Sequence, residues 1–258
     1  MSIYQHFREE EQPFIDQVLS WKEMVERTYQ PKLTDFLDPR QCRIINTLIP
    51  DTEHELKVLE YGGGKDTERK RVLIAPYYET VVENDFNLSL IETTFPEKFV
   101  TISHKDVLGA FLSLGIVRDK LGDIVIIDGT VQLVIAQEIA LFVKMNLTQI
   151  KRATVKFYEK PLSERIQSVE QWIKSTATVT SLRLDNVVKE IYNISRKDAR
   201  QAILKQLVKV NFKTIDDAKF LLEEGDLISF RGKGRSKLVE ILGETRKGKT
   251  RIITARLN

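Results

Sequence analysis

The sequence predicts an α+β protein built from several small domains, and three observations lead to this prediction. With 258 residues, the chain is long enough for two or three hydrophobic cores. Apolar residues recur at helical spacing in some segments and at strand-like spacing in others. Charge is divided unevenly, because residues 1–175 hold 22 Lys and Arg against 27 Asp and Glu, whereas residues 176–258 hold 18 against 10. An acidic body therefore precedes a basic C-terminal domain.

The first predicted domain, residues 1–75, is mostly helical with some extended structure. Apolar residues at near-helical spacing between residues 10 and 29 indicate one amphipathic helix. A second helix is expected at Asp38-Pro39, an N-cap residue followed by proline at the first helical position. The only cysteine, Cys42, lies in the apolar run of this second helix. We therefore predict a buried thiol, and neither a disulfide nor a thiolate metal cluster.

The second predicted domain, residues 76–160, has the order β-α-β-β-α-β, which is typical of an RRM-like α/β sandwich. Its clearest local signal is a hairpin in which Asp128-Gly129 forms a two-residue turn between two apolar runs. RRM domains bind single-stranded RNA through aromatic side chains on two central strands, where this sequence has Val, Ile and Leu. We therefore favour a structural or docking role over base stacking.

A Ser/Thr-rich connector is expected over residues 161–181, and the basic domain follows over residues 182–258. Its first short helix begins near Leu182. Ser195 has the N-cap position of a second helix, and Asp198 three residues later completes a capping box. Several short strands follow, so the predicted order is two helices and then a small sheet.

Basic side chains are placed in this domain where they can meet a nucleic-acid backbone. Arg196 and Arg200 lie four residues apart on one flank of the second helix, beside Lys197. Guanidinium groups at this spacing can reach successive phosphates, and the helix N-terminus adds amide donors. A second basic group alternates with Gly232 and Gly234, which keep its loop open to phosphates; its members are Arg231, Lys233, Arg235 and Lys237.

This order and these residues resemble the S4 domain, an RNA-binding module of two helices and a small sheet. The matching positions are Arg183-Leu184-Asp185, Ser195-Arg196, Ala199, Val210-Asn211, Gly225-Asp226, Ile228 and Arg231-Gly232. One position departs from the pattern, because Gln206 stands where the family usually has glycine after the second helix. The resemblance and the basic pattern together predict these RNA-binding residues: Arg183, Ser195, Arg196, Lys197, Arg200, Lys205, Asn211, Arg231, Lys233, Arg235 and Lys237.

Nearly the whole chain resembles the YlmH family of bacterial S4-domain proteins, through the segments FLDPRQ, GGGKDTERKR and RDKLGDI together with the S4 module. The resemblance implies a non-catalytic protein that docks on structured RNA, either rRNA or tRNA, on the large ribosomal subunit. It also implies a role in ribosome-associated quality control or a link to cell division. The acidic body is then expected to meet a protein partner or another RNA surface.

Two other functions stay open as alternatives at this point. One is an RNA-modifying enzyme, a pseudouridine synthase or methyltransferase, that uses the S4 domain as its anchor. The other is a division factor that acts through protein contacts, with RNA binding incidental. Residues 1–175 show neither the catalytic motif of the first enzyme class nor the glycine-rich cofactor loop of the second.

The segment Gly62-Gly63-Gly64-Lys65 invites comparison with a phosphate-binding Walker loop. Leu59 and Asp66 stand where that loop requires a glycine and a Ser or Thr, so we predict a flexible basic loop instead. This loop is a candidate second RNA contact through its basic residues Lys65, Arg69, Lys70 and Arg71.

No catalytic constellation, cofactor-binding motif or metal-ligand spacing is evident, and His6, His54 and His104 are scattered. We therefore predict no enzymatic activity, no cofactor and no metal. The N-terminus has no apolar signal-peptide core, and no run of 18 apolar residues could span a bilayer. A cytoplasmic protein without membrane insertion is expected.

Overall fold

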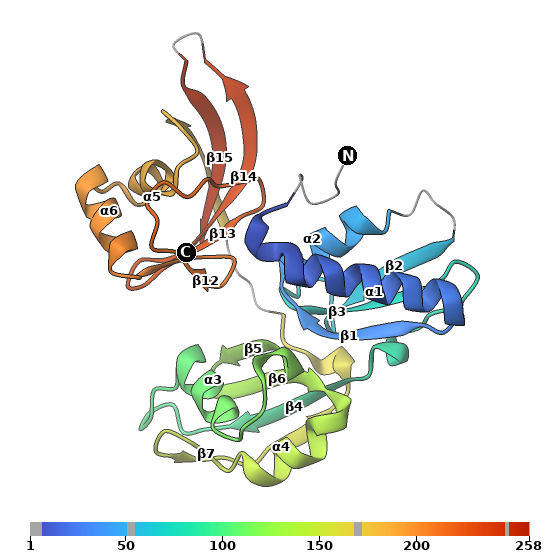
Figure 1. Ribbon diagram of the computed structural model, residues 1–258. Coiled ribbons are helices and arrows are strands. Elements are labelled where there is room, and N and C mark those ends of the chain that lie inside the picture. The colour runs from blue at the N-terminus through green and yellow to red at the C-terminus, as the bar shows by residue number, and fades with distance from the viewer. Residues whose placement is uncertain (1–6, 51–54, 168–171, 246–247, 258) are drawn as a thin grey trace. The chain divides into compact units, whose positions relative to one another are not determined.

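Each part of the chain combines helices with an antiparallel sheet, which confirms the α+β prediction (Figure 1). The computed structural model describes residues 7–50, 55–167, 172–245 and 248–257. It divides into two units, Met1–Ser168 (unit 1) and Val169–Asn258 (unit 2). None of the described helices combines the length and apolar character needed to cross a membrane.

The N-terminal part of unit 1 is a three-stranded antiparallel sheet with two helices packed on it. Its elements are a 3-10 helix (Glu9–Glu11), α1 (Gln12–Thr28), β1 (Lys32–Leu37), α2 (Pro39–Leu48), β2 (Leu56–Tyr61) and β3 (Lys70–Pro76). The strand order is β1-β3-β2. Both helices direct apolar side chains onto the sheet, and the fully buried residues of this core include Ile15, Val18, Ile45, Val72 and Ile74.

The predicted start of α2 is confirmed by its capping contacts. The Asp38 carboxylate accepts a hydrogen bond from the Gln41 amide at 2.9 Å, and Gln41 Oε1 accepts one from the Asp38 amide at 2.9 Å. This reciprocal box fixes the helix entry directly after β1. Cys42 in the next turn is buried, and burial raises the pKa of its thiol to about 12. The burial of this thiol, predicted from the sequence, is thus confirmed.

The middle part of unit 1 has the predicted split-βαβ arrangement. Its elements are β4 (Leu88–Thr94), α3 (His104–Leu112), β5 (Leu121–Ile127), β6 (Thr130–Ala136), α4 (Ala140–Asn146), β7 (Gln149–Ile150), β8 (Ala153–Thr154) and β9 (Tyr158–Lys160). The four-stranded sheet has the order β5-β6-β4-β9, and every neighbouring pair is antiparallel. Asp128 and Gly129 both have positive φ (47° and 73°), which forms the predicted hairpin turn.

The two faces of this middle sheet have different neighbours. Helices α3 and α4 cover one face, where Phe111 and Val143 are fully buried. The opposite face carries Leu90 and Val134, which pack with Phe36 of β1. In an RRM this helix-free face is where RNA bases stack. Here apolar contacts with the N-terminal part of the unit occupy it, which fits the structural role favoured from the sequence.

Buried arginines also join the two parts of unit 1. Arg69 and Arg71, at the start of β3, are only 6% and 5% exposed. The Arg69 guanidinium donates to the carbonyl oxygen of Phe36 at 2.7 Å and to the Asp119 carboxylate at 3.0 Å. The Arg71 guanidinium donates to the carbonyl oxygen of Thr34 at 2.7 Å. Both side chains therefore belong to the folded framework.

These contacts correct the prediction of a flexible basic loop at residues 65–71. Lys70 lies in β3 and pairs with Glu60 at 3.0 Å, and Lys65 is the one exposed member of the predicted group. The glycine run is packed as well, since a Cβ placed on Gly62 would lie 2.4 Å from the Arg69 carbonyl oxygen. RNA could reach Arg69 and Arg71 only if this junction opened, so they are not surface contacts.

The carboxylate of Asp123, in β5, closes the same junction from the middle sheet. It accepts hydrogen bonds from the backbone amides of Glu68 at 2.9 Å and Arg69 at 3.0 Å, and Arg165 Nη2 lies 3.4 Å away. Burial raises the pKa of Asp123 above its usual value, although the two amides and Arg165 oppose this shift. One carboxylate thus holds the glycine-rich segment, the middle sheet and the segment that follows β9.

Unit 2 is a six-stranded antiparallel sheet with two helices. Its elements are β10 (Trp172–Val179), α5 (Leu184–Tyr192), α6 (Arg196–Leu204), β11 (Val208–Val210), β12 (Lys213–Thr214), β13 (Leu227–Phe230), β14 (Gly234–Glu244) and β15 (Thr250–Leu257). The strand order is β10-β15-β14-β13-β11-β12. The predicted connector over residues 161–181 is wrong from residue 172 onward, because β10 pairs with β15 along its whole length.

The departure at Gln206 does not change the turn after α6. Gln206 has φ 56°, so a non-glycine residue occupies the left-handed conformation that the usual glycine would adopt there. Its amide donates to the carbonyl oxygen of Ile203 at 2.8 Å, and the Leu207 amide donates to that of Ala202 at 3.0 Å. The chain therefore makes the expected entry into β11.

Replacing Asp123 tests whether the contacts between the two parts of unit 1 stabilise the fold. We expect Asp123→Ala to lower the free energy of unfolding of unit 1 by about 3–5 kcal/mol, because it leaves the buried Arg165 guanidinium and two amides without an acceptor. Urea unfolding of a Trp172→Phe background, followed by Trp21 fluorescence, measures this. The matched control is Asp119→Ala, whose carboxylate is 61% exposed, and which should cost less than about 1 kcal/mol. Equal losses in both variants would contradict the assignment.

Candidate nucleic-acid interface

The candidate interface begins with the two helices of unit 2 and the way each one starts. Ser195 is the N-cap of α6, and its hydroxyl accepts the Asp198 amide at 3.0 Å while donating to the Asp198 carboxylate at 2.7 Å. Ser195 is thus confirmed as the N-cap, whereas the predicted capping box differs, because the Asp198 carboxylate bonds the Ser195 hydroxyl in place of the Ser195 amide. Asn193, with φ 48°, ends α5 just before this cap. The short turn therefore brings the first residues of α6 back toward the start of α5.

A buried carboxylate connects the beginnings of the two helices. Asp185 is 1% exposed and accepts two hydrogen bonds from Arg183, at 3.1 and 2.9 Å, and one from Arg196 Nε at 3.1 Å. Burial by itself raises the pKa of Asp185, but the hydrogen bonds from Arg183 and Arg196 outweigh it and hold the pKa below its usual value. The carboxylate is therefore ionised at neutral pH and fixes both guanidinium groups.

Both arginines keep part of their surface open to solvent. The Arg183 side chain is 28% exposed and the Arg196 side chain is 56% exposed. Lys197 and Arg200, in the first two turns of α6, are exposed, and so is Lys205 at its C-terminal end. The positive end of the α6 dipole lies beside Arg196, Lys197 and Arg200. The arrangement suits an anion that is larger than a single carboxylate.

The turn after β13 adds cations close to the end of α6. The Arg231 amide donates to the carbonyl oxygen of Leu207 at 2.8 Å, and the side chains of Arg231 and Lys233 are exposed. Arg256 of β15 was not predicted from the sequence. Its guanidinium lies 5.1 Å from the centre of the Tyr192 ring and donates to the carbonyl oxygen of Lys233 at 3.2 Å. We call the following set the helix-side group: Arg183, Arg196, Lys197, Arg200, Lys205, Arg231, Lys233 and Arg256.

Arg235 and Lys237 lie on the other face of the sheet. Ser236, between them in β14, hydrogen-bonds Tyr192 of α5 at 3.1 Å, so Ser236 faces the helices. Successive side chains of a strand alternate between faces, which directs Arg235 and Lys237 away from the helices. Lys237 Nζ lies 4.0 Å from the centre of the Trp172 ring, which supports this orientation. The residues predicted as one basic loop are therefore divided between two surfaces.

Two more cations that the sequence analysis did not name lie on this second face. Lys174 and Lys237 are both paired with Ala255 in the strand register, so they flank a small residue roughly 10 Å apart, two strand spacings. Arg251 lies on the same face, because it pairs with Thr178, which is four residues from Lys174 in β10. We call this set the open-face group: Lys174, Arg235, Lys237 and Arg251. A strand prediction over residues 172–179 would have revealed it.

Asn211 is engaged within the unit and holds a turn. With φ 47°, it donates from its side-chain amide to Asp226 Oδ1 at 2.7 Å and accepts the Leu227 amide at 3.0 Å. Asp226 is 1% exposed and accepts the Glu223 amide at 2.8 Å as well. Direct RNA contact by Asn211, as predicted, would have to displace these bonds. The Asn and Asp of the S4 pattern, Asn211 and Asp226, therefore hydrogen-bond each other and hold the start of β13 in place.

Acidic, cysteine and histidine side chains are the usual protein ligands of metal ions. Across the described parts of the chain, no group of three or more His, Cys, Asp or Glu is arranged to hold a metal ion. Of the three histidines, His6 and His54 lie outside the described residues.

Comparison with known families divides the chain into three matched segments. Residues 10–79 match the model described as "YlmH, N-terminal", residues 82–164 match "Putative RNA-binding domain in YlmH", and residues 182–228 match "S4 domain". The matches cover both parts of unit 1 and the helices of unit 2 up to β13.

Two individual proteins are similar to this chain over longer stretches. The "Ribosome-associated protein quality control protein P2" of Bacillus subtilis (strain 168) is 41% identical over 252 residues, which cover 97% of this chain and 96% of that protein. The solved structure of the "Cell division protein ylmH from Streptococcus pneumoniae" is 34% identical with a TM-score of 0.55, and the match covers 64% of this chain and 100% of that chain.

The buried Asp185 carboxylate gives a testable link between charge and stability. We expect Asp185→Asn to lower the free energy of unfolding of unit 2 by about 1–3 kcal/mol at pH 7, because a charged acceptor of three hydrogen bonds is lost. The folded-state pKa is lowered, so this contribution is present above the unfolded pKa of about 3.9 and disappears as the pH falls through the folded value. Urea unfolding of a Trp21→Phe background, followed by Trp172 fluorescence between pH 2.5 and 7, measures it.

The control for this measurement is Asp216→Asn, an exposed carboxylate in the same unit. It should change stability by less than about 0.5 kcal/mol at any pH. A destabilisation by Asp185→Asn that is as large at pH 2.5 as at pH 7 would show that lost packing, and not the ionised carboxylate, is responsible.

Proposed function

Since the chain belongs to the YlmH family of S4-domain proteins, we propose that it is an RNA-binding protein of the ribosome that docks on structured rRNA or tRNA through unit 2. The observation that carries the proposal is the pair of guanidinium groups, Arg183 and Arg196, held by the buried Asp185 beside the N-terminus of α6. Arginines with a fixed orientation and an exposed outer edge are suited to phosphate oxygens. Folding of unit 2 therefore fixes the orientation of both guanidinium groups before RNA binds.

The helix-side group is proposed as the main phosphate contact. Its cations come from both ends of α6 and from the neighbouring turn, so they can follow a backbone rather than bind one isolated phosphate. The open-face group is proposed as a second contact, with Trp172 as an aromatic surface beside Lys237. Two contacts on opposite faces favour RNA with tertiary structure over a single strand.

At a finer level we propose that the target lies on the large ribosomal subunit and that the protein acts in ribosome-associated quality control. The name of the Bacillus subtilis relative supports this assignment. The name of the Streptococcus pneumoniae protein supports a link to cell division, which disturbed ribosome function could produce without a separate activity. We propose that it acts in the cytoplasm and without catalysis.

Unit 1 is proposed to orient the RNA-binding unit and to meet a protein partner. Its charge is acidic and its middle sheet is closed by packing, which disfavours a second RNA surface of RRM type. Arg69 and Arg71, which the sequence offers as candidates for RNA contact, serve its internal junction.

Charge reversal on α6 tests the proposal directly. We expect Lys197→Glu/Arg200→Glu, which leaves the Arg196–Asp185 contact intact, to abolish co-sedimentation with ribosomes at physiological salt, because two attractive phosphate contacts become repulsive. The matched control is Lys98→Glu/Lys105→Glu, which makes the same change in net charge at exposed positions of unit 1 and should leave co-sedimentation intact. Normal co-sedimentation of the α6 variant would sink the proposed role of unit 2.

The salt dependence of binding gives the number of phosphates involved. With three to five contacts, a plot of log affinity for rRNA against log salt concentration should have a slope of roughly −2 to −5. Filter binding between 50 and 300 mM KCl measures it. The single variant Arg200→Gln should make the slope less steep by about one. A slope near zero would contradict a phosphate-led mode of binding.

A further inference from the structure

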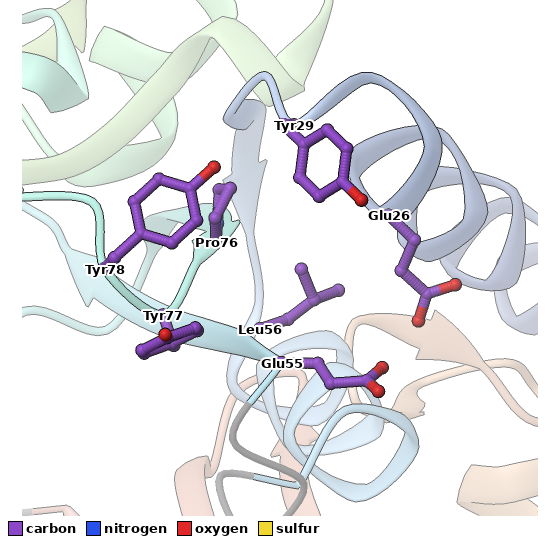
Figure 2. Close-up of a pocket in the computed structure, with 7 residues that line it drawn as sticks. All are labelled: Glu26, Tyr29, Glu55, Leu56, Pro76, Tyr77 and Tyr78. Carbon is purple, nitrogen blue, oxygen red and sulfur yellow. The ribbon is translucent and has the colours of Figure 1, made fainter.

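A small aromatic and acidic cavity lies at one end of the N-terminal sheet of unit 1. Its volume is about 290 Å³ (Figure 2). The lining comes from three places that the fold brings together: the end of α1, the start of β2 and the segment after β3. The lining residues are Glu26, Tyr29, Glu55, Leu56, Pro76, Tyr77 and Tyr78.

The tyrosines of this cavity are unusually open to solvent. Tyr29, Tyr77 and Tyr78 are 66%, 63% and 59% exposed, although large aromatic side chains are normally buried. Tyr77 and Tyr78 meet edge to face, with ring centres 5.5 Å apart and an angle of 82° between the rings. Three exposed aromatic rings thus lie together around one cavity, where a ligand could contact them.

Backbone hydrogen bonds fix the main chain at two of these tyrosines. The Tyr29 amide donates to the carbonyl oxygen of Val25 at 2.8 Å, and Tyr29 ends α1 with φ 56°. The Tyr77 amide donates to the carbonyl oxygen of Glu55 at 3.1 Å, which ties the segment after β3 to the start of β2. The cavity is therefore largely preformed, which reduces the entropy cost of binding.

Two carboxylates give the cavity its charge. Glu26 is 3.9 Å from Lys22, a long distance for an ion pair, and Figure 2 shows the Glu26 and Glu55 carboxylates on the same side of Leu56. Among the described residues, the Glu55 side chain takes part in no ion pair or hydrogen bond. The nearby Lys57 donates to the backbone oxygen of Glu79 and leaves the carboxylates available.

We propose that this cavity binds an arginine side chain presented by a partner protein. A guanidinium group is planar and stacks on aromatic rings, and it can form a forked pair of hydrogen bonds with a carboxylate. Tyrosine and arginine are also the residues that most often dominate protein–protein contacts. The volume suits one long side chain, and the acidic charge of residues 1–175 attracts a basic segment.

The same charges argue against the other ligands that tyrosines attract. An RNA base could stack on the rings, but its phosphates would lie beside Glu26 and Glu55. A purely apolar segment would leave both carboxylates unpaired at a closed interface. Arginine binding here does not depend on RNA binding by unit 2, so either can fail without the other.

The test uses the full chain with 13C-labelled leucine methyl groups, because Leu56 lines the cavity and reports its occupation. N-acetyl-arginine methylamide is titrated in, and the citrulline analogue is the neutral ligand of the same shape. We expect arginine to shift the Leu56 methyl signals saturably, and citrulline to bind at least about threefold more weakly. Tyr78→Leu and Glu55→Gln should each raise the Kd for arginine about three- to tenfold.

The matched control variants change the same residue types elsewhere in unit 1. Tyr158→Leu removes a 56% exposed tyrosine and Glu97→Gln an exposed carboxylate, and neither should change the Kd. The Lys197→Glu/Arg200→Glu variant should titrate like the unmodified chain. Equal binding of citrulline, or an unchanged Kd in both cavity variants, would overturn the proposal. So would uridine monophosphate shifting the Leu56 signals at lower concentration than arginine, which would indicate a base-stacking site.

Discussion

The surface proposed to bind RNA depends on one buried carboxylate. Asp185 loses its hydration when unit 2 folds, and this cost is offset only if Arg183 and Arg196 both donate to it. The requirement fixes the angle between α5 and α6 as well as the direction of the two guanidinium groups. Lysine at position 183 would lose the forked pair of hydrogen bonds that the Arg183 guanidinium makes with this carboxylate. The stability of unit 2 and the orientation of the two arginines proposed to bind RNA thus depend on the same contacts.

Unit 1 uses the same chemistry for a purely structural purpose. Arg69 and Arg71 are surrounded by carbonyl oxygens and carboxylates, and their exposed fractions are an order of magnitude lower than that of Arg196. In the sequence both groups are short basic runs, and charge alone does not separate them. Their acceptors, such as Phe36 and Asp119, are more than 30 residues distant in the chain. Only the folded arrangement distinguishes a buried junction from an exposed contact.

Local chemistry explains which parts of the fold could be predicted. The box at Asp38, the cap at Ser195 and the turn at Asp128-Gly129 depend on residues within four positions of each other, and all three are present. Strand β10 resembles a connector because its alternating Ser and Thr are typical of linkers, and its partner β15 lies about 80 residues later. Without that pairing, Lys174 and the second basic face stay hidden in the sequence. Local sequence therefore predicts many of the basic residues, but their division between two faces, and the part that Lys174 contributes, depend on long-range strand pairing.

The division of cations between two faces has a consequence for specificity. Phosphate contacts carry no sequence information, so the helix-side and open-face groups cannot recognise an RNA by its bases. They lie on opposite sides of one sheet, and a single straight backbone cannot reach both. Folded RNA that brings two backbone segments to either side of the unit can do so. In the proposed mode, unit 2 recognises the shape of the RNA. The two backbone segments must be separated by the thickness of one helix layer and one sheet.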